Sequence, residues 1–251
     1  MMATLVLFCA TLTAAGAPST KVLIVHDEPG PMAVLADAFK EKAGFTVVSV
    51  EQEKLPDDLS GFAAVFNFVH KPMTPRAEQL CIEYARNGGR HILLHHAISS
   101  SKRKNPKLLD ELNSEVPPGR KPANGFYVER GTLTIVNLAP KHFITSNRIT
   151  YPAKSNFPDA AGQPIERDSF SFDNTEIFLN LKFPPCPERT TLYGITFRDA
   201  DGKSFAQLAG GWVMRTGKGY CFYFQAGHEA RDFASPIYQQ ILINCVQWKP
   251  K

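Results

Sequence analysis

A short apolar segment that ends in two adjacent histidines constrains the fold of this chain more than any other sequence feature. Gly88 and Gly89 are typical of a helix end. Residues 92–94 (Ile-Leu-Leu) then form the kind of apolar run found in a strand covered on both faces, and His95 and His96 follow at once. Ligands bind outside the carboxyl ends of the strands in open α/β sheets. The pair therefore lies where a functional site is expected.

Other histidines occupy the same position on other predicted strands. His26, His70 and His228 each lie at, or shortly after, the end of an apolar segment. The carboxyl ends of parallel strands meet at one edge of a sheet, so side chains that follow them are brought together. Together with His95 and His96, five of the seven histidines are therefore predicted to gather at one edge.

The order of elements predicts a parallel sheet with helices on both faces. Thr74 and Pro75 are typical of a helix start, with a hydroxyl cap followed by proline at the first helical position. Alternating strands and helices with short links favour the α/β class. Strands are predicted at residues 21–26, 45–50, 62–69, 90–95, 127–136, 191–197, 205–215 and 220–225, and helices at residues 32–42, 74–87, 108–112 and 236–248. The middle of the chain is less regular, and residues 140–164 are predicted to form a loop.

The charge of the chain restricts its possible partners, and the N-terminal residues indicate its cellular compartment. The net charge is only +4 and the basic residues are spread out, so no nucleic-acid partner is expected. Residues 1–17 resemble a secretory signal, with an apolar core at 5–12 and small residues at 15–17. This segment is too short to span a membrane. We expect a periplasmic or secreted protein; the alternative is a weakly apolar N-terminus on a cytoplasmic one.

The cysteines and the first strand restrict the possible cofactors. Four cysteines follow residue 17, and none has the CxxC spacing of a zinc ribbon. A disulfide is possible in an exported protein, but the sequence does not select a pair. No GxGxxG motif follows the first strand, so no nucleotide cofactor is expected. Imidazoles and carboxylates suit zinc or another divalent transition metal. Any such ligands would have to come from separate strand ends, which leaves metal binding open.

Several landmarks, taken in order, resemble the trehalose-utilisation (ThuA-like) family. They are Gly88-Gly89, His95-His96-Ala97, residues 141–145, residues 174–176 and the closing block from Gly217 to Glu229 followed by Trp248. The resemblance spans residues 21–248, which we expect to form one domain. It implies the flavodoxin-like, doubly wound and mostly parallel sheet of class I glutamine amidotransferases, with an irregular middle insertion. It also implies a sugar or oxidised-sugar substrate.

The resemblance argues for the amidotransferase fold and against glutaminase activity. Those enzymes carry a cysteine nucleophile on the turn after the central strand, whereas this chain has His95 and His96 there. An imidazole cannot form the thioester. The chain also departs from the family pattern at His142, which precedes phenylalanine instead of proline, and at Glu176, where the usual acidic pair is broken by Thr175.

The candidate catalytic residues are His96, His228 and Glu229. Imidazole titrates near neutral pH and suits proton transfer, and a carboxylate beside His228 can raise its basicity. The structural alternatives are a loop-bonded His96 and a Glu229 that caps a helix. Side chains alternate along a strand, so His96 is expected to reach the cleft and His95 to point away. The candidate substrate-binding residues are His26, His70, His95, His142 and Glu176.

Two classes of function remain open at this point. The first is an exported enzyme that processes a disaccharide or keto-sugar, as a hydrolase, lyase or isomerase, by acid–base or metal-assisted chemistry. The second is a non-catalytic domain that holds a sugar or a partner protein in the cleft of a decayed amidotransferase fold. The oligomeric state is not specified by the sequence.

Overall fold

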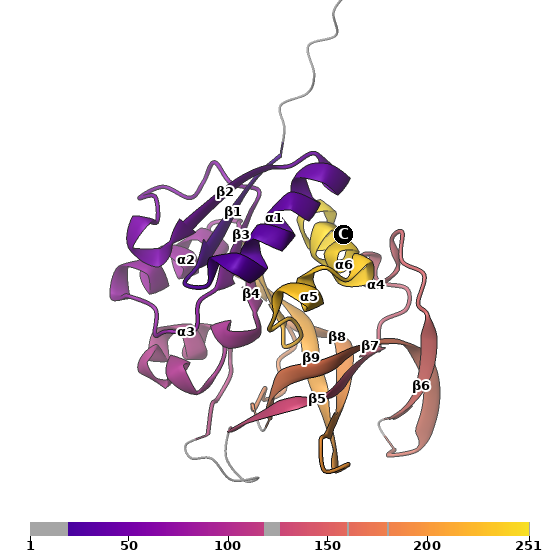
Figure 1. Cartoon of the computed structure of the whole chain (residues 1–251). Helices are drawn as coiled ribbons and strands as arrows, with labels where there is room; N and C mark the ends of the chain where they lie inside the picture. The colour runs from indigo at the N-terminus through magenta and orange to yellow at the C-terminus, as the bar shows by residue number, and fades with distance from the viewer. Residues whose placement is uncertain (1–19, 118–125, 160, 180, 251) are drawn as a thin grey trace, which may run out of the picture.

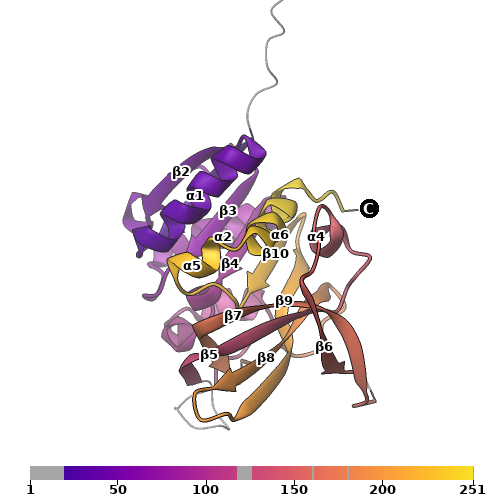
Figure 2. The same cartoon turned by 45° about the vertical axis from the view of Figure 1, so that its right-hand side comes forward.

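The computed structural model describes residues 20–117, 126–159, 161–179 and 181–250, and the statements below refer to these residues. The predicted signal segment, residues 1–17, lies outside them. The described strands form one ten-stranded sheet in the order β2-β1-β3-β4-β10-β9-β8-β5-β7-β6 (Figures 1 and 2).

The first half of the sheet is parallel, as the alternation of strands and helices predicts. Each of its strands pairs in parallel with its neighbour. It contains β2 (Thr46–Glu51), β1 (Lys21–His26), β3 (Ala64–Phe68), β4 (Arg90–Leu94) and β10 (Gly219–Phe224). The central strand β4 is buried on both faces, with Ile92 and Leu94 in one apolar core and Leu93 in the other. This arrangement confirms the predicted fold class.

The second half is an antiparallel extension that continues the same sheet from β10. It contains β9 (Ser204–Thr216), β8 (Arg189–Asp199), β5 (Phe126–Asn137), β7 (Pro164–Leu179) and β6 (Ala153–Pro158). The turn between β9 and β10 connects the two strands as a hairpin, and Gly217 there has a φ of +58°, which favours glycine. The middle of the chain is thus more regular than its sequence indicates.

Helices cover both faces of the parallel half. Helices α1 (Pro29–Ala43), α5 (Ala230–Phe233) and α6 (Pro236–Gln247) contact one another and lie side by side in both views (Figures 1 and 2). Helices α2 (Pro75–Arg86) and α3 (Pro106–Glu111) belong to the opposite face, where α2 contacts β4 and β10. The sheet is therefore doubly wound.

Helix α2 shows how local sequence sets the boundaries that position the site. Thr74 Oγ1 accepts a hydrogen bond from the backbone N–H of Ala77 at 3.2 Å, which satisfies one of the free donors of the first turn. The helix ends at Arg86, and Gly88 adopts a φ of +113°. A Cβ atom on Gly89 would lie 2.4 Å from the ring of Tyr84, so only glycine fits before β4.

The prediction of a loop over residues 140–164 is wrong. This segment contains α4 (Phe143–Ser146), which contacts α6, and the edge strand β6. Strand β6 pairs only with β7, and among its residues only Phe157 is buried. An edge strand with one buried side chain lacks the apolar alternation that identifies a half-buried strand, so its sequence resembles a loop.

The structure also tests the possible disulfide and the search for a membrane-spanning segment. Cys81, Cys186, Cys221 and Cys245 are all free thiols, so none of the possible disulfides forms between them. Burial raises the pKa of Cys81 and of Cys221 to about 12. Among the described helices, none is long and apolar enough to cross a membrane.

Candidate functional site

The carboxyl ends of the parallel strands bring four candidate side chains to one point. The potential ligand atoms of His95, His96, His228 and Glu176 all lie within 4.8 Å of one another, and we call these residues the histidine cluster. His95 and His96 follow β4, and His228 follows β10, its parallel neighbour. Glu176 comes from β7 in the antiparallel half.

The turn after β4 places both adjacent histidines in the cluster. His95 begins a 3₁₀ turn, η2 (His95–Ala97), and has a φ of +44°, which is uncommon for a residue other than glycine. The strand geometry therefore stops before His95, and its side chain does not continue the alternation of β4. The expectation that His95 points away from the cleft is wrong for this reason.

The tautomer of His95 follows from its contacts. Nδ1 lies 2.7 Å from the carbonyl oxygen of Gln225. A carbonyl oxygen only accepts hydrogen bonds, so Nδ1 carries the proton. In the neutral imidazole Nε2 then holds a lone pair, and it faces Glu176 Oε1 at 3.4 Å. Burial alone would raise the pKa of Glu176, but its interaction with His95 and the charges on nearby imidazoles lower that pKa overall.

His96 is the most enclosed member of the cluster. Its side chain is 1% exposed, and its ring stacks on that of His70, with centroids 4.4 Å apart and planes 4° from parallel. Neither ring nitrogen has a hydrogen-bond partner among the described residues. Burial, together with the neighbouring imidazoles and Lys102, lowers the pKa of His96 far below its usual value. His96 is therefore neutral, and its lone pair is unused.

The backbone of His228 is held by the start of α5, whereas the side chain of Glu229 caps that helix and does not join the histidine cluster. The backbone N–H groups of His228 and Glu229 both donate to Asp232 Oδ2, at 2.9 and 3.2 Å. The His228 ring stacks on His95 with centroids 5.0 Å apart. The Glu229 carboxylate takes part in the capping box of α5 and pairs with Arg231 at 2.9 Å. Helix capping, the alternative foreseen for Glu229, is the role that the structure shows.

A second group joins the cluster through His96. Glu28, His70 and His96 also offer ligand atoms within 4.8 Å of one another. Glu28 Oε1 lies 3.4 Å from His70 Nδ1, and the Asp27 carboxylate accepts hydrogen bonds from the backbone N–H groups of His70 and Lys71 at 2.8 and 2.9 Å. These contacts fix the turn that follows β3 beside the histidine cluster.

Lys102 holds the turn after β3 through hydrogen bonds from its amine. The sequence does not identify it as a site residue. Its amine is buried and donates to three successive carbonyl oxygens, those of Val69, His70 and Lys71, at 2.6, 3.2 and 2.5 Å. Burial lowers the pKa of Lys102 to about 8. Lys102 lies in a polar, basic segment, η3 (Ser100–Lys104), whose composition gives no sign of burial.

Two candidates lie outside both groups. His26 ends β1, is 9% exposed, and belongs to neither set of potential ligands. His142 caps α4, because its Nδ1 accepts from the backbone N–H of Ile144 at 3.2 Å. Its ring also contacts Trp248, which in turn contacts Tyr220 at the start of β10. His142 therefore lies near the amino ends of the strands, at the opposite edge from the histidine cluster.

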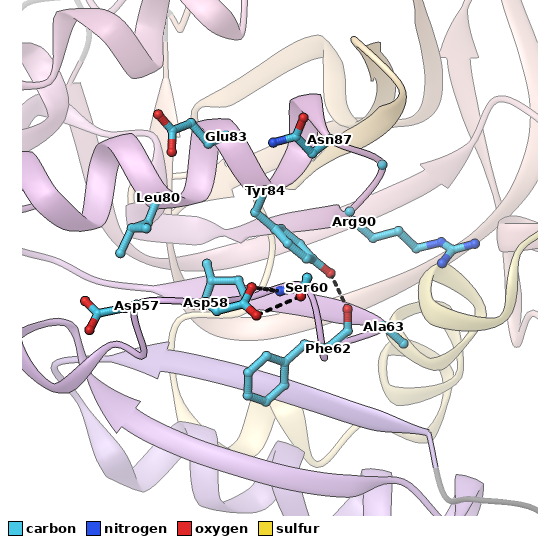
Figure 3. A pocket seen from close by; sticks show the side chains of 13 residues that line it. Asp57, Asp58, Ser60, Phe62, Ala63, Leu80, Glu83, Tyr84, Asn87 and Arg90 are labelled. Carbon is cyan, nitrogen blue, oxygen red and sulfur yellow. Dashed lines mark hydrogen bonds between the residues drawn. The ribbon is translucent and has the colours of Figure 1, made fainter.

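A cavity of about 420 Å³ also lies at that opposite edge (Figure 3). It is lined by the end of α2 and by the segment that enters β3, including Asp58, Glu83 and Arg90. Three hydrogen bonds lie in its wall: Tyr84 Oη donates to the Phe62 carbonyl at 2.8 Å, and the Asp58 carboxylate accepts from the backbone N–H and the hydroxyl of Ser60. None of the candidate residues lines it.

Irregular pairing in the antiparallel half aims Glu176 at the cluster. The β5–β7 ladder shifts register between Val128 and Gly131 and again between Gly131 and Leu133. Asn174 of β7 has a φ of +53°. Bulges bend a strand and redirect its side chains, and they are common beside active sites. Thr175 also donates to Asp232 Oδ2 at 2.7 Å, which ties β7 to the residues that hold His228.

The chain has the fold of class I glutamine amidotransferases, with histidines at the end of the central strand. A family described as trehalose utilisation (ThuA) matches residues 20–249. The chain belongs to this ThuA family, as the sequence landmarks predict.

Solved structures show the same fold at low sequence identity. A ThuA-like protein from Bacteroides uniformis has a TM-score of 0.64 and 16% identity, with 96% of this chain and 95% of that chain covered. A ThuA-like protein from Parabacteroides merdae has a TM-score of 0.64 and 14% identity, with 92% and 89% covered. A glutamine amidotransferase from Thermotoga maritima has a TM-score of 0.53 and 13% identity, with 91% and 99% covered. No match was found among curated proteins.

Proposed function

We propose that this chain is an exported carbohydrate-processing enzyme that acts on a disaccharide or keto-sugar at the histidine cluster. The carrying observation is the convergence of three imidazoles and one carboxylate at the carboxyl edge of the parallel strands, where α/β proteins bind their ligands. The family description, trehalose utilisation, supports a disaccharide as the substrate class. The composition of residues 1–17 supports export.

The chemistry that fits these groups is proton transfer at a hydroxyl- or carbonyl-bearing carbon, alone or assisted by a metal. His228 and Glu176 are the partly exposed members of the cluster, so they are the ones placed to touch a sugar. His95 and His96 are buried behind them. A positioned acid or base contributes a factor of about 10²–10⁴ to the rate.

Glutaminase activity is not part of this proposal. No cysteine follows β4, where His95 and His96 lie. Cys81, Cys221 and Cys245 are buried, and burial raises the pKa of each thiol. A thiol nucleophile acts as its thiolate, so none of these three is suited to attack an amide.

The test is a thermal-shift screen of the protein from residue 18 onward against trehalose, other disaccharides and their keto derivatives, followed by a turnover assay on each hit. A ligand at a hundredfold excess over its dissociation constant stabilises the fold by about 2.7 kcal/mol. For a domain of this size that raises the melting temperature by about 5–11 °C.

Two variants sharpen the screen. Glu176→Gln keeps the shape of the side chain and removes its charge, so it should lower turnover by at least about a hundredfold. His142→Gln, at the opposite edge, is the matched control and should keep full turnover. A sugar that binds the cluster without yielding product would contradict the enzyme and favour the alternative, a non-catalytic sugar-binding domain. No shift with any sugar would contradict both.

A further inference from the structure

Three chain segments direct four potential metal-ligand side chains to one point at the edge of the sheet. The segments are the η2 turn, the loop after β10 and the bulged strand β7, with η2 supplying two residues. The four side chains are separated by as many as 133 positions in the sequence, so only the tertiary fold brings them together. Such a convergence needs a physical reason, because like lone pairs repel.

The contact between His95 Nε2 and the Glu176 carboxylate requires a positive charge between the two atoms. A His95 ring that carries its only proton on Nδ1 presents a lone pair at Nε2, and the Glu176 carboxylate lies 3.4 Å from this nitrogen. Two acceptors at this distance are stable only with a proton or a cation between them. A proton on Nε2 would satisfy this pair of residues.

His96 is not satisfied by that proton. Both of its ring nitrogens are buried and unpartnered among the described residues, and its ring centroid lies 4.4 Å from that of His95 and 5.2 Å from that of His228. Buried polar atoms are nearly always bonded, and an exception calls for an ion or water to explain it. One cation shared by the four side chains would satisfy His95, Glu176 and one ring nitrogen of His96 together.

The spacing and the donor types agree with a transition metal. Ligand bonds of about 2.1 Å in a tetrahedral zinc site separate two ligand atoms by about 3.4 Å, as observed between His95 and Glu176. Imidazole nitrogen favours zinc, copper, iron and nickel, whereas calcium and magnesium favour oxygen. The Nδ1–H contact from His95 to a backbone carbonyl is the outer-shell bond that metal-bound histidines commonly make.

We propose that His95, His96, His228 and Glu176 bind one divalent transition-metal ion of the zinc type. His95 would bind through Nε2, since Nδ1 is committed to Gln225, and Glu176 would supply the single negative charge. This site is independent of the sugar substrate proposed above, because it depends only on the protein's own side chains.

The experiment uses protein without a histidine tag, from residue 18 onward, stripped of metal by a chelator and dialysed. Zinc(II) is titrated in, and bound metal per chain is measured by mass spectrometry after gel filtration. Cobalt(II) is titrated in parallel, because its visible absorption reports nitrogen and oxygen coordination directly. Neither readout requires a substrate.

Three variants separate this site from adventitious binding. His96→Gln and Glu176→Gln each remove one ligand, and His142→Gln removes a histidine at the opposite edge while leaving the cluster intact. Circular dichroism and melting temperature confirm that each variant is folded. Losing a direct ligand should weaken binding by more than the roughly 10–100-fold that outer-shell changes cost.

The expected result is one zinc or cobalt ion per chain in the unchanged protein and in His142→Gln, with weak or no binding in His96→Gln and Glu176→Gln. Equal uptake by all four proteins, or no uptake by the unchanged protein, would overturn the proposal. If His96→Gln does not fold, Glu176→Gln decides alone. Metal uptake without sugar turnover would remove only the proposed function, and turnover without metal uptake would remove only the metal site.

Discussion

The buried imidazole of His91 is expected to make the free energy of unfolding depend on pH, and the size of this effect can be measured. It lies in the middle of the parallel half, where it pairs with Val65 of β3 and Cys221 of β10. The side chain is fully buried, and both ring nitrogens are unpartnered among the described residues. Burial lowers the pKa of His91 from 6.5 to about 4, because charging the ring there would remove its hydration.

The sign of the resulting pH dependence follows from linkage. Between pH 6.5 and pH 4 the unfolded chain binds a proton at His91 and the folded chain does not, so the free energy of unfolding falls as the pH falls. Each pH unit in this window costs about 1.4 kcal/mol. At pH 5 the loss relative to pH 7.5 is therefore about 2 kcal/mol, and it levels off below pH 4.

The perturbation is His91→Leu, which fills a similar volume without a titratable group. At pH 7.5 its stability should be close to or above that of the unchanged protein, since two unpartnered polar atoms are removed. Melting temperatures of both proteins are compared at pH 7.5 and pH 5. The unchanged protein should lose about 4–8 °C more than the variant, because other titrating groups act on both and cancel.

Equal losses in the two proteins would refute the reasoning. That result would mean that the His91 ring is charged or hydrated in the folded state, and that its burial carries no penalty against protonation. A larger loss in His91→Leu would refute it as well.

Two further predictions concern Lys102 and Asp232, which hold the backbone beside the histidine cluster. Lys102→Met keeps the aliphatic stem but leaves three carbonyl oxygens after β3 without their donor, so urea denaturation should show a loss of about 2–3 kcal/mol; an unchanged midpoint would contradict the role of Lys102. Asp232→Ala removes the acceptor for the backbone N–H groups of His228 and Glu229 and for Thr175. It should cost about 1–2 kcal/mol and shift the His228 ring signals in NMR spectra, and Asp232→Asn should recover part of the loss.

The parallel half of the fold was predictable because its strands are buried on both faces. Residues 92–94 are wholly apolar, and a hydroxyl and a proline mark the start of α2 at Thr74 and Pro75. Strand β6 was not predictable, because as an edge strand it buries only Phe157 among polar neighbours. A strand buried on both faces has a continuous apolar sequence, whereas an edge strand that buries one side chain has almost no recognisable pattern.

The site was predictable only in part, for similar reasons. The gathering of His95, His96 and His228 follows from parallel strands whose ends coincide. That both His95 and His96 join the cluster depends on the left-handed backbone at His95, and no glycine or asparagine there signals it. Lys102 has the sequence context of a solvated loop residue, and only the carbonyl oxygens of a distant turn explain its burial.

The place of Glu176 on β7 has a consequence for how the histidine cluster could change in evolution. The three imidazoles follow strands of the parallel half of the sheet, whereas the carboxylate belongs to β7, part of the antiparallel extension. The two parts touch at the site but are encoded by separate stretches of the gene. A descendant that rebuilt β7 would exchange one group of the site and keep the others in place. The site therefore combines histidines from the parallel half with one group from a strand outside it.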